Sequence, residues 1–308
     1  ETFGDDVLEN LEEHHVLKTL LDELHDMDPT DERFPAKAEV LAETVEHHHE
    51  EEDRLTALYR RVMAPLIGSL PGLRCIAVDR PCFGLSGRAE HSTAKLRQLA
   101  VDFLAETLDA LNLDRAVFVA NSMGSLWTMW FGLDQPDRVV AMAHVGCPAF
   151  ILGTSAPFPM RLMSVRPIGK VLMSLSPPSR RQVQSFAAMI GEDLSNNPEL
   201  LDLLVAAQKL PGVQSGIRGL LHAAVRVRGA RPSIALTRAQ LGAIRQPVLL
   251  VWGPRDRVGP VEVGRAAAEA IPNATFYQLD EGGHIPWVQQ PEAVATAVRP
   301  FLDTHIAH

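Results

Sequence analysis

Three polar residues far apart in the chain, Ser122, Asp256 and His284, are of the types that nucleophilic catalysis requires. A serine hydroxyl is a poor nucleophile at neutral pH, so an imidazole must take its proton during attack, and a carboxylate must orient that imidazole. Each residue alone has an ordinary explanation: a turn serine, a helix-capping aspartate and a loop histidine. Because all three directly follow apolar runs, in the order Ser, Asp, His, the pattern favours a catalytic triad.

The serine lies between two apolar segments. Residues 116–120 carry no charge and predict a strand buried on both faces, and the apolar residues of 126–131 have a spacing that suits a buried helix. A nucleophile elbow needs this arrangement, with small residues two before and two after the serine so that strand and helix can pass closely. Ala120 and Gly124 occupy these positions, and alanine replaces the usual glycine. The context therefore predicts that Ser122 is an exposed nucleophile.

Strand-like and helix-like segments alternate over most of the chain after residue 60. Alternation of this kind predicts an α/β fold, a mostly parallel sheet with helices on both faces, whose sites lie beyond the carboxyl ends of the strands. Residues 148–235 break the pattern with helical stretches and no strands between them, which predicts a helical cap over a pocket. The expected strands are 74–79, 116–120, 139–145, 247–253 and 274–279, and the expected helices outside the cap are 92–112, 260–271 and 291–303.

The composition predicts where in the cell the protein is found and which classes of partner it can bind. The chain has 308 residues, 46% of them hydrophobic, but no run of eighteen apolar residues, so we expect no membrane span. The N-terminus is acidic and polar, unlike a signal peptide, and three widely spaced cysteines without a metal or disulfide pattern favour a reducing compartment. We therefore expect a cytoplasmic protein. The net charge of −9 argues against a nucleic-acid partner, and the oligomeric state stays open.

The charge is divided between two modules. The first 54 residues hold 19 of the 38 acidic residues but 4 of the 29 lysines and arginines, a net charge of −15, whereas the rest carries +6. Six of the twelve histidines also lie there. Apolar residues at three- and four-residue spacing predict two helices joined by a turn near residue 30. We therefore expect an acidic helical hairpin over 1–60 and a second domain over 61–308.

The hairpin carries histidine and carboxylate side chains that share a helix face, such as His48 and Glu52, which are four residues apart and could hold one metal ion. The segments Glu12-Glu13-His14-His15-Val16-Leu17 and Val45-Glu46-His47-His48-His49-Glu50-Glu51-Glu52 resemble the hemerythrin-like HHE family, over about residues 5–55. The resemblance implies iron ligated by His14 or His15 and by His48 with Glu52, or His47 with Glu51. Only the last two helices of such a four-helix bundle are matched, so one chain cannot complete the di-iron site. The alternative is a hairpin that binds no metal.

The remainder resembles the α/β-hydrolase fold family over about residues 61–305. The matching motifs are Asp79-Arg80-Pro81-x-Phe83-Gly84-x-Ser86, Asn121-Ser122-Met123-Gly124, Gly253-x-x-Asp256 and Gly283-His284, with Cys82 where glycine is common. The resemblance implies a cofactor-free hydrolase in which His284 activates Ser122, Asp256 orients His284 and the Met123 backbone amide is an oxyanion donor. Its substrate would be a small ester or related acyl compound with an apolar part; esterases, thioesterases, carbon–carbon bond hydrolases and perhydrolases all remain open.

One part of the family pattern is missing. The second oxyanion donor normally comes from a loop after a central strand, but upstream of Ala64 this chain has acidic helices without an apolar strand or a His-Gly turn. The absent strand would lie between those predicted at 74–79 and 116–120. Three hypotheses follow: an active serine hydrolase, an impaired hydrolase-like scaffold that lacks the second donor, or a metal- or oxygen-binding protein that acts through its hairpin.

Overall fold

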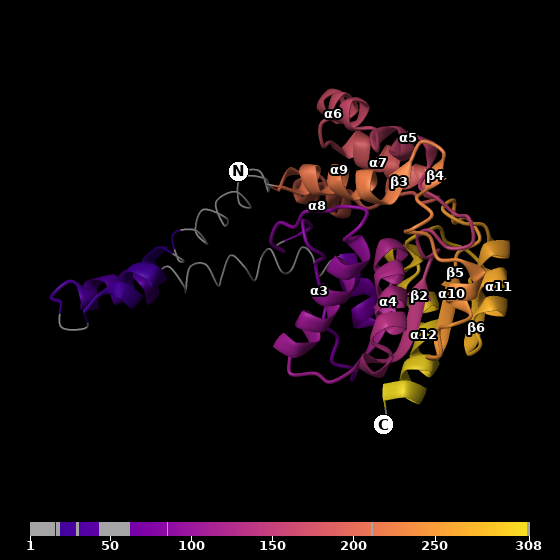
Figure 1. Cartoon of the computed structure of the whole chain (residues 1–308), viewed down its shortest axis with the longest axis horizontal. Helices are drawn as coiled ribbons and strands as arrows, with labels where there is room; N and C mark the ends of the chain where they lie inside the picture. Colours follow the sequence, from indigo (N-terminus) through magenta and orange to yellow (C-terminus); the bar gives the residue numbers. More distant parts are fainter. Residues whose placement is uncertain are drawn as a thin grey trace.

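The main structural element is a four-stranded parallel sheet, which confirms the predicted fold class (Figure 1). The computed structural model describes residues 16, 19–28, 31–42, 62–84, 86–210 and 212–306. The strand order is β1-β2-β5-β6, and every neighbouring pair is parallel. The strands are β1 (Ala116–Ala120), β2 (Val139–Val145), β5 (Val248–Trp252) and β6 (Ala274–Gln278).

The two inner strands are almost entirely apolar because helices cover both faces of the sheet. All five residues of β5 are buried, and β2 is buried except at its second residue. Successive side chains of a strand point to opposite faces. Met142 of β2 therefore packs in a core with α3 (Leu96–Ala110), α4 (Ser122–Asp134) and α11 (Val261–Ala270), whereas Ala143 and Val145 pack in a second core with α12 (Pro291–Ile306) and helical residues 62–68.

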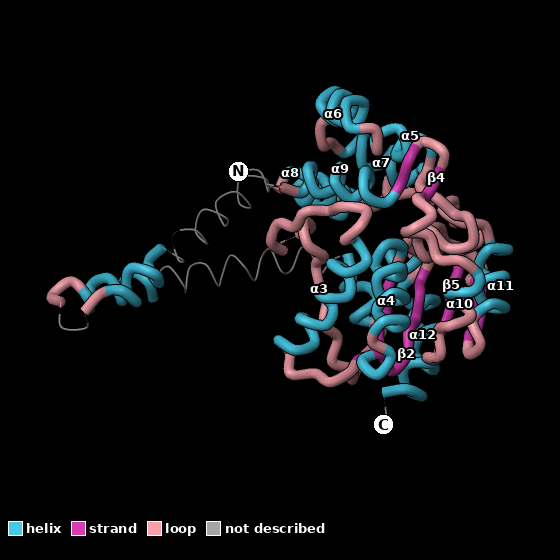
Figure 2. Tube along the Cα trace, viewed as in Figure 1, coloured by secondary structure: helices cyan, strands magenta, loops and turns pink. Residues whose placement is uncertain are grey.

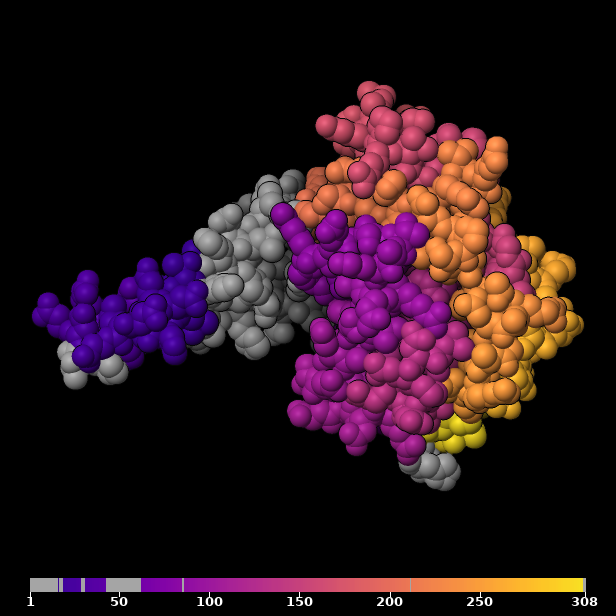
Figure 3. Space-filling model, viewed as in Figure 1, coloured from indigo at the N-terminus to yellow at the C-terminus, as the bar shows by residue number. Residues whose placement is uncertain are grey.

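A helical cap lies over the carboxyl ends of the strands (Figures 1 and 2). The space-filling view shows the cap helices, in pink-red and orange, at the top of the molecule (Figure 3). It has a small core of its own around Val183 and Leu200, and it begins after β2, in the region where the sequence pattern changes. As predicted, no strand lies between the cap helices in the described residues; a two-residue antiparallel pair, which was not predicted, follows the last of them. The cap elements are α5 (Phe158–Met163), α6 (Arg166–Leu175), α7 (Arg180–Met189), α8 (Pro198–Lys209), α9 (Val213–Ala224), β3 (Val225–Arg226) and β4 (Gly229–Ala230).

Short helices complete the connections. α10 (Arg238–Leu241) begins with a capping box in which Thr237 and Gln240 satisfy each other's backbone amides. Two 3₁₀ turns, η1 (Pro136–Arg138) and η2 (Pro286–Val288), lead into β2 and α12. Within the described ranges, no helix combines the length and the apolar composition that crossing a membrane would require.

The strand predicted at 74–79 does not form. Residues 74–80 have no regular secondary structure, and Ile76 and Val78 are 43% and 45% exposed rather than buried. A strand requires a neighbour that satisfies its backbone N–H and C=O groups. In the described part of the chain β1 pairs with β2 only, so it is an edge strand and supplies no bridge to residues 74–80. An apolar sequence alone was insufficient to make this strand.

The N-terminal module is described only in part. Residues 19–26 and 34–42 are helical, and Lys37 forms an ion pair with Glu23 between them; most of the second predicted helix, whose stripe runs from Leu41 to Leu55, lies outside the described residues. The histidines and the glutamate predicted to bind metal lie outside the described residues: His14, His15, His47, His48, Glu51 and Glu52.

Candidate active site

The predicted elbow is present at the junction of β1 and α4. Ser122 is the first residue of α4 and has φ of 51°, a left-handed conformation that is uncommon for any residue with a side chain. Asn121 before it is extended, so the chain reverses sharply at the serine. A Cβ added to Gly124 would lie 3.9 Å from the Ala120 Cβ, an ordinary van der Waals contact, so the space at this position does not itself require glycine. Backbone strain of this kind is typical of a nucleophile elbow.

Asp256 and His284 form a buried hydrogen-bonded pair. Asp256 lies in the loop after β5 and His284 in the loop after β6, and their Oδ2 and Nδ1 atoms are 2.9 Å apart. The carboxylate also accepts hydrogen bonds from the backbone amides of Cys147 and Val258, both at 2.8 Å. The Asp256 side chain is fully buried and that of His284 is 5% exposed. An acidic partner at Nδ1 assigns the ring proton to that nitrogen and leaves Nε2 with a free lone pair.

Asn121 joins the elbow to the loop that carries His284. Its Nδ2 donates hydrogen bonds to the carbonyl oxygens of Val145, at 2.6 Å, and of His284, at 2.8 Å. Gly146 makes this convergence possible: it has φ of 79°, and a Cβ there would lie 2.3 Å from the His284 carbonyl oxygen. The Ser122 hydroxyl itself makes no hydrogen bond within the described residues. The backbone of His284 is thus held beside the residue that precedes Ser122.

The start of α4 carries the backbone amide that is expected from the sequence to be an oxyanion donor, that of Met123. Met123 is the second residue of the helix, and amides in the first turn of a helix have no intrahelical acceptor. They also lie at the positive end of the helix dipole. The Ser122 carbonyl oxygen accepts a hydrogen bond from the Ala149 amide at 2.9 Å, and this bond fixes the elbow against the segment after β2. The Met123 amide therefore lies in the first turn of α4, directly after Ser122.

Sequence reasoning missed one buried carboxyl group near this pair, that of Glu192 in the cap. Its Oε1 accepts a hydrogen bond from the Ile285 amide at 2.6 Å, directly after His284. Burial raises the pKa of this carboxyl group above its ordinary value. No sequence motif marks it, because the contact joins residues 93 positions apart. The neighbouring Cys147 is also buried, and burial raises the pKa of its thiol.

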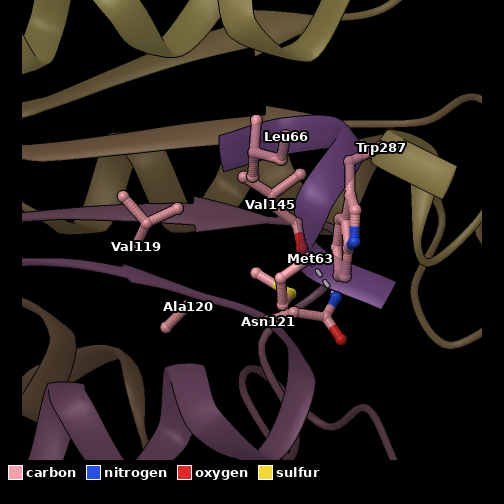
Figure 4. Close-up of a pocket in the computed structure, with 7 residues that line it drawn as sticks. All are labelled: Met63, Leu66, Val119, Ala120, Asn121, Val145 and Trp287. Carbon is pink, nitrogen blue, oxygen red and sulfur yellow. Dashed lines mark hydrogen bonds between the residues drawn. The ribbon is translucent and has the colours of Figure 1, made fainter. Parts of the chain in front are cut away.

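A cavity of about 220 Å³ lies beside the end of β1 (Figure 4). Its only polar lining side chain among the described residues is that of Asn121, the residue before Ser122. The remaining lining residues are apolar and come from helical residues 62–68, the ends of β1 and β2, and η2: Met63, Leu66, Val119, Ala120, Val145 and Trp287. The space suits a small apolar group.

The metal ligands predicted for the hairpin cannot be placed, because they lie outside the described residues. Within the ranges that the structure does describe, no group of three or more histidine, cysteine, aspartate or glutamate side chains is arranged to hold a metal ion.

Comparison with known proteins agrees with this arrangement. The family model described as alpha/beta hydrolase fold matches residues 56–291. The chain is 26% identical to pimeloyl-[acyl-carrier protein] methyl ester esterase of Chromobacterium violaceum, over 80% of this chain and 91% of that one. It is 30% identical to 2-hydroxy-6-oxononadienedioate/2-hydroxy-6-oxononatrienedioate hydrolase of Cupriavidus pinatubonensis, over 78% of each.

Solved structures show the same fold. A meta-cleavage product hydrolase (CumD) of Pseudomonas fluorescens superposes with a TM-score of 0.62 at 20% identity, covering 80% of this chain and 85% of that one. Carboxylesterase CesB of Bacillus subtilis gives 0.61 at 21% identity, covering 78% of both chains. The family model spans well over half of the residues, and the parallel sheet, elbow and cap are those of its fold. The chain belongs to the alpha/beta hydrolase fold family.

Proposed function

We propose that this protein is a serine hydrolase that cleaves small carboxylic esters or related acyl compounds with an apolar part, using Ser122, His284 and Asp256 as a catalytic triad. The observation that carries the proposal is the buried Asp256–His284 pair, whose loop is tied by Asn121 to the strained turn at Ser122. A solvated surface histidine would need neither a buried carboxylate nor this tether.

The chemistry follows from the protonation states that the contacts favour. His284 Nε2 takes the hydroxyl proton as Ser122 attacks the acyl carbon, and Asp256 stabilises the positive imidazole. The tetrahedral oxygen accepts a hydrogen bond from the Met123 amide. The same imidazole then gives its proton to the leaving group, and it later activates the water that releases the acyl group from Ser122.

The cavity and the relatives support an apolar acyl part. The cavity at Asn121 is lined mainly by aliphatic and aromatic side chains; it borders the residue before Ser122, while Ser122 and His284 are not among the residues that line it. The named relatives include an esterase that acts on a methyl ester and hydrolases of oxo-acids. All three cysteines are free, which supports a reducing compartment and thus our proposal of a cytoplasmic location.

Covalent labelling tests the triad. A fluorophosphonate probe should label the wild type and fail to label Ser122→Ala, while Ser125→Ala, which alters a buried serine of the same helix, keeps the label. Hydrolysis of p-nitrophenyl esters of increasing chain length should peak at a particular length if the cavity holds the acyl group. Absence of a Ser122-dependent label refutes the serine hydrolase, and a flat chain-length profile refutes the apolar slot.

A second candidate is an impaired hydrolase-like scaffold, which the irregular residues 74–80 and the edge position of β1 favour. Loss of one oxyanion donor costs roughly 2.7–4 kcal/mol, or about 100- to 1000-fold in rate. This candidate predicts Ser122-dependent labelling with ester turnover near background. The metal-binding hypothesis rests on the hairpin sequence, and metal analysis of the purified protein tests it: iron far below stoichiometric amounts would remove it.

A further inference from the structure

The end of α7 and the cap segment that follows it contact both loops that carry the proposed catalytic pair, the loop of Asp256 and the loop of His284. The Arg257 guanidinium donates a hydrogen bond to the Ala188 carbonyl oxygen at 3.1 Å. Gly191 has φ of 92°, and a Cβ there would lie 2.0 Å from the Arg255 carbonyl oxygen. The cap backbone therefore passes so close to the Asp256 loop that only glycine fits.

Glu192 follows this glycine and points its carboxyl group into the core, where the residue is 4% exposed. Its Oε1 accepts the Ile285 amide at 2.6 Å. A Cβ on Gly283 would lie 2.7 Å from the same oxygen, so the backbone on both sides of His284 runs against this carboxyl group. Its Oε2 is buried and has no hydrogen-bond partner among the described residues.

The charges around Glu192 make its carboxylate form more stable when His284 is protonated than when His284 is neutral. Burial raises the pKa of the carboxyl group, and the Asp256 charge raises it further; the Ile285 amide, His284 and the Arg255 guanidinium lower it. A buried carboxylate near another carboxylate is costly unless a positive charge lies close. That positive charge arises when His284 takes the serine proton, so the carboxylate stabilises the protonated ring more than the neutral one.

We propose that Glu192 is a positioning residue of the site: from the cap, it fixes the backbone of the His284 loop through Ile285, and its charge stabilises the protonated imidazole together with Asp256. This inference rests on the proposed hydrolase function and deepens it. It also couples the cap to the acid–base pair, because a displacement of residues 190–193 would change the distance between the Glu192 carboxylate and the His284 imidazole.

Charge and hydrogen bond can be separated by substitution. Glu192→Gln keeps an acceptor for the Ile285 amide and removes the charge, and Glu192→Ala removes both. Asp193→Asn is the matched control, because it removes an equal charge from an exposed position in the same segment. The rate of ester hydrolysis is measured from pH 5 to 9 for each variant, with kcat and KM separated, alongside fluorophosphonate labelling.

We expect Glu192→Gln to lower kcat about threefold or more with little change in KM, and to move the acid limb of the kcat/KM profile to lower pH by about half a unit or more. Asp193→Asn should match the wild type. If the Glu192→Gln profile coincides with that of the wild type, the carboxyl group has only a structural role and the proposal is overturned.

A measurement without turnover keeps this proposal distinct from the hydrolase proposal. If the wild type shows no Ser122-dependent label, the hydrolase proposal fails, and amide hydrogen exchange at Ile285 then tests the placement of Glu192. The amide should be protected in the wild type and in Glu192→Gln but exchange about tenfold or more faster in Glu192→Ala. Equal protection in all three overturns the inference.

Discussion

His144 provides a stability test that is independent of catalysis. It lies in the middle of the sheet on β2, is fully buried, and is paired in register with Ala120 on one side and Leu250 on the other. Neither ring nitrogen has a hydrogen-bond partner in the described part of the chain. Burial lowers the pKa of this imidazole from 6.5 to about 3. The folded protein therefore holds His144 neutral at a pH where the unfolded chain would protonate it.

The sign and size of the effect follow from proton linkage. Between pH 6.5 and 3 the unfolded state binds more protons at this residue than the folded state, so stability is lost as pH falls through that window. The loss from His144 amounts to about 2 kcal/mol at pH 5 and to about 4–5 kcal/mol below pH 3, since one unit of pKa difference is worth about 1.4 kcal/mol. Above pH 7 the residue has almost no pH-dependent effect.

Urea unfolding of the wild type and of His144→Leu at pH 7.5 and pH 5.0 measures this difference. The wild type should lose about 2 kcal/mol more unfolding free energy than the variant between the two pH values, whatever the variant's absolute stability. His25→Leu, at an exposed histidine, is the control for replacing a histidine by leucine. Losses that agree within about 0.5 kcal/mol for wild type and His144→Leu would refute the buried, neutral histidine.

Two further predictions concern the junction of elbow and histidine loop. Asn121→Ala removes the donor to the Val145 and His284 carbonyl oxygens, so we expect a loss of about 1–3 kcal/mol in unfolding free energy and slower fluorophosphonate labelling; unchanged labelling would contradict the tether. Gly146→Ala places a Cβ against the His284 carbonyl oxygen at positive φ and should cost about 1–3 kcal/mol by thermal unfolding, whereas Gly68→Ala, where an added Cβ meets nothing, should not destabilise the protein.

The parts of this molecule that the sequence predicted are those whose cause is local. The apolar run before Ser122 and the helix after it are decided by neighbouring residues, and the two-residue spacing of Ala120 and Gly124 marks a tight turn. The carboxyl ends of parallel strands lie at one edge of a sheet, so Asp256 and His284 could be placed near each other before any distance was known. In the structure the Asp256 Oδ2 and His284 Nδ1 atoms lie 2.9 Å apart.

The features that sequence reasoning predicted wrongly or did not find depend on contacts between residues far apart in the chain. Residues 74–79 have the composition of a strand, but a strand exists only with a partner, and the partner is decided elsewhere in the chain. Glu192 lies in a cap loop of unremarkable sequence, and its role depends on a contact with Ile285 across 93 positions. The two-residue strands β3 and β4 are too short to leave any periodic signal.

The architecture divides the proposed catalytic machinery into two halves with different supports. Asp256, His284 and Glu192 are positioned by loops that follow the buried strands β2 and β5 and the edge strand β6, and by the cap segment before α8. In the proposed mechanism, the oxyanion is stabilised by the Met123 amide and by a second backbone donor. The second donor would come from a segment beside the free edge of β1, where the described chain supplies no strand. Labelling by a reactive phosphonate requires a single attack by Ser122, whereas turnover of an ester requires oxyanion stabilisation in both acylation and deacylation. A wild type that labels readily but hydrolyses esters slowly, by about 100- to 1000-fold relative to an enzyme with both donors, would therefore locate the deficit at the edge of β1 rather than in the acid–base pair.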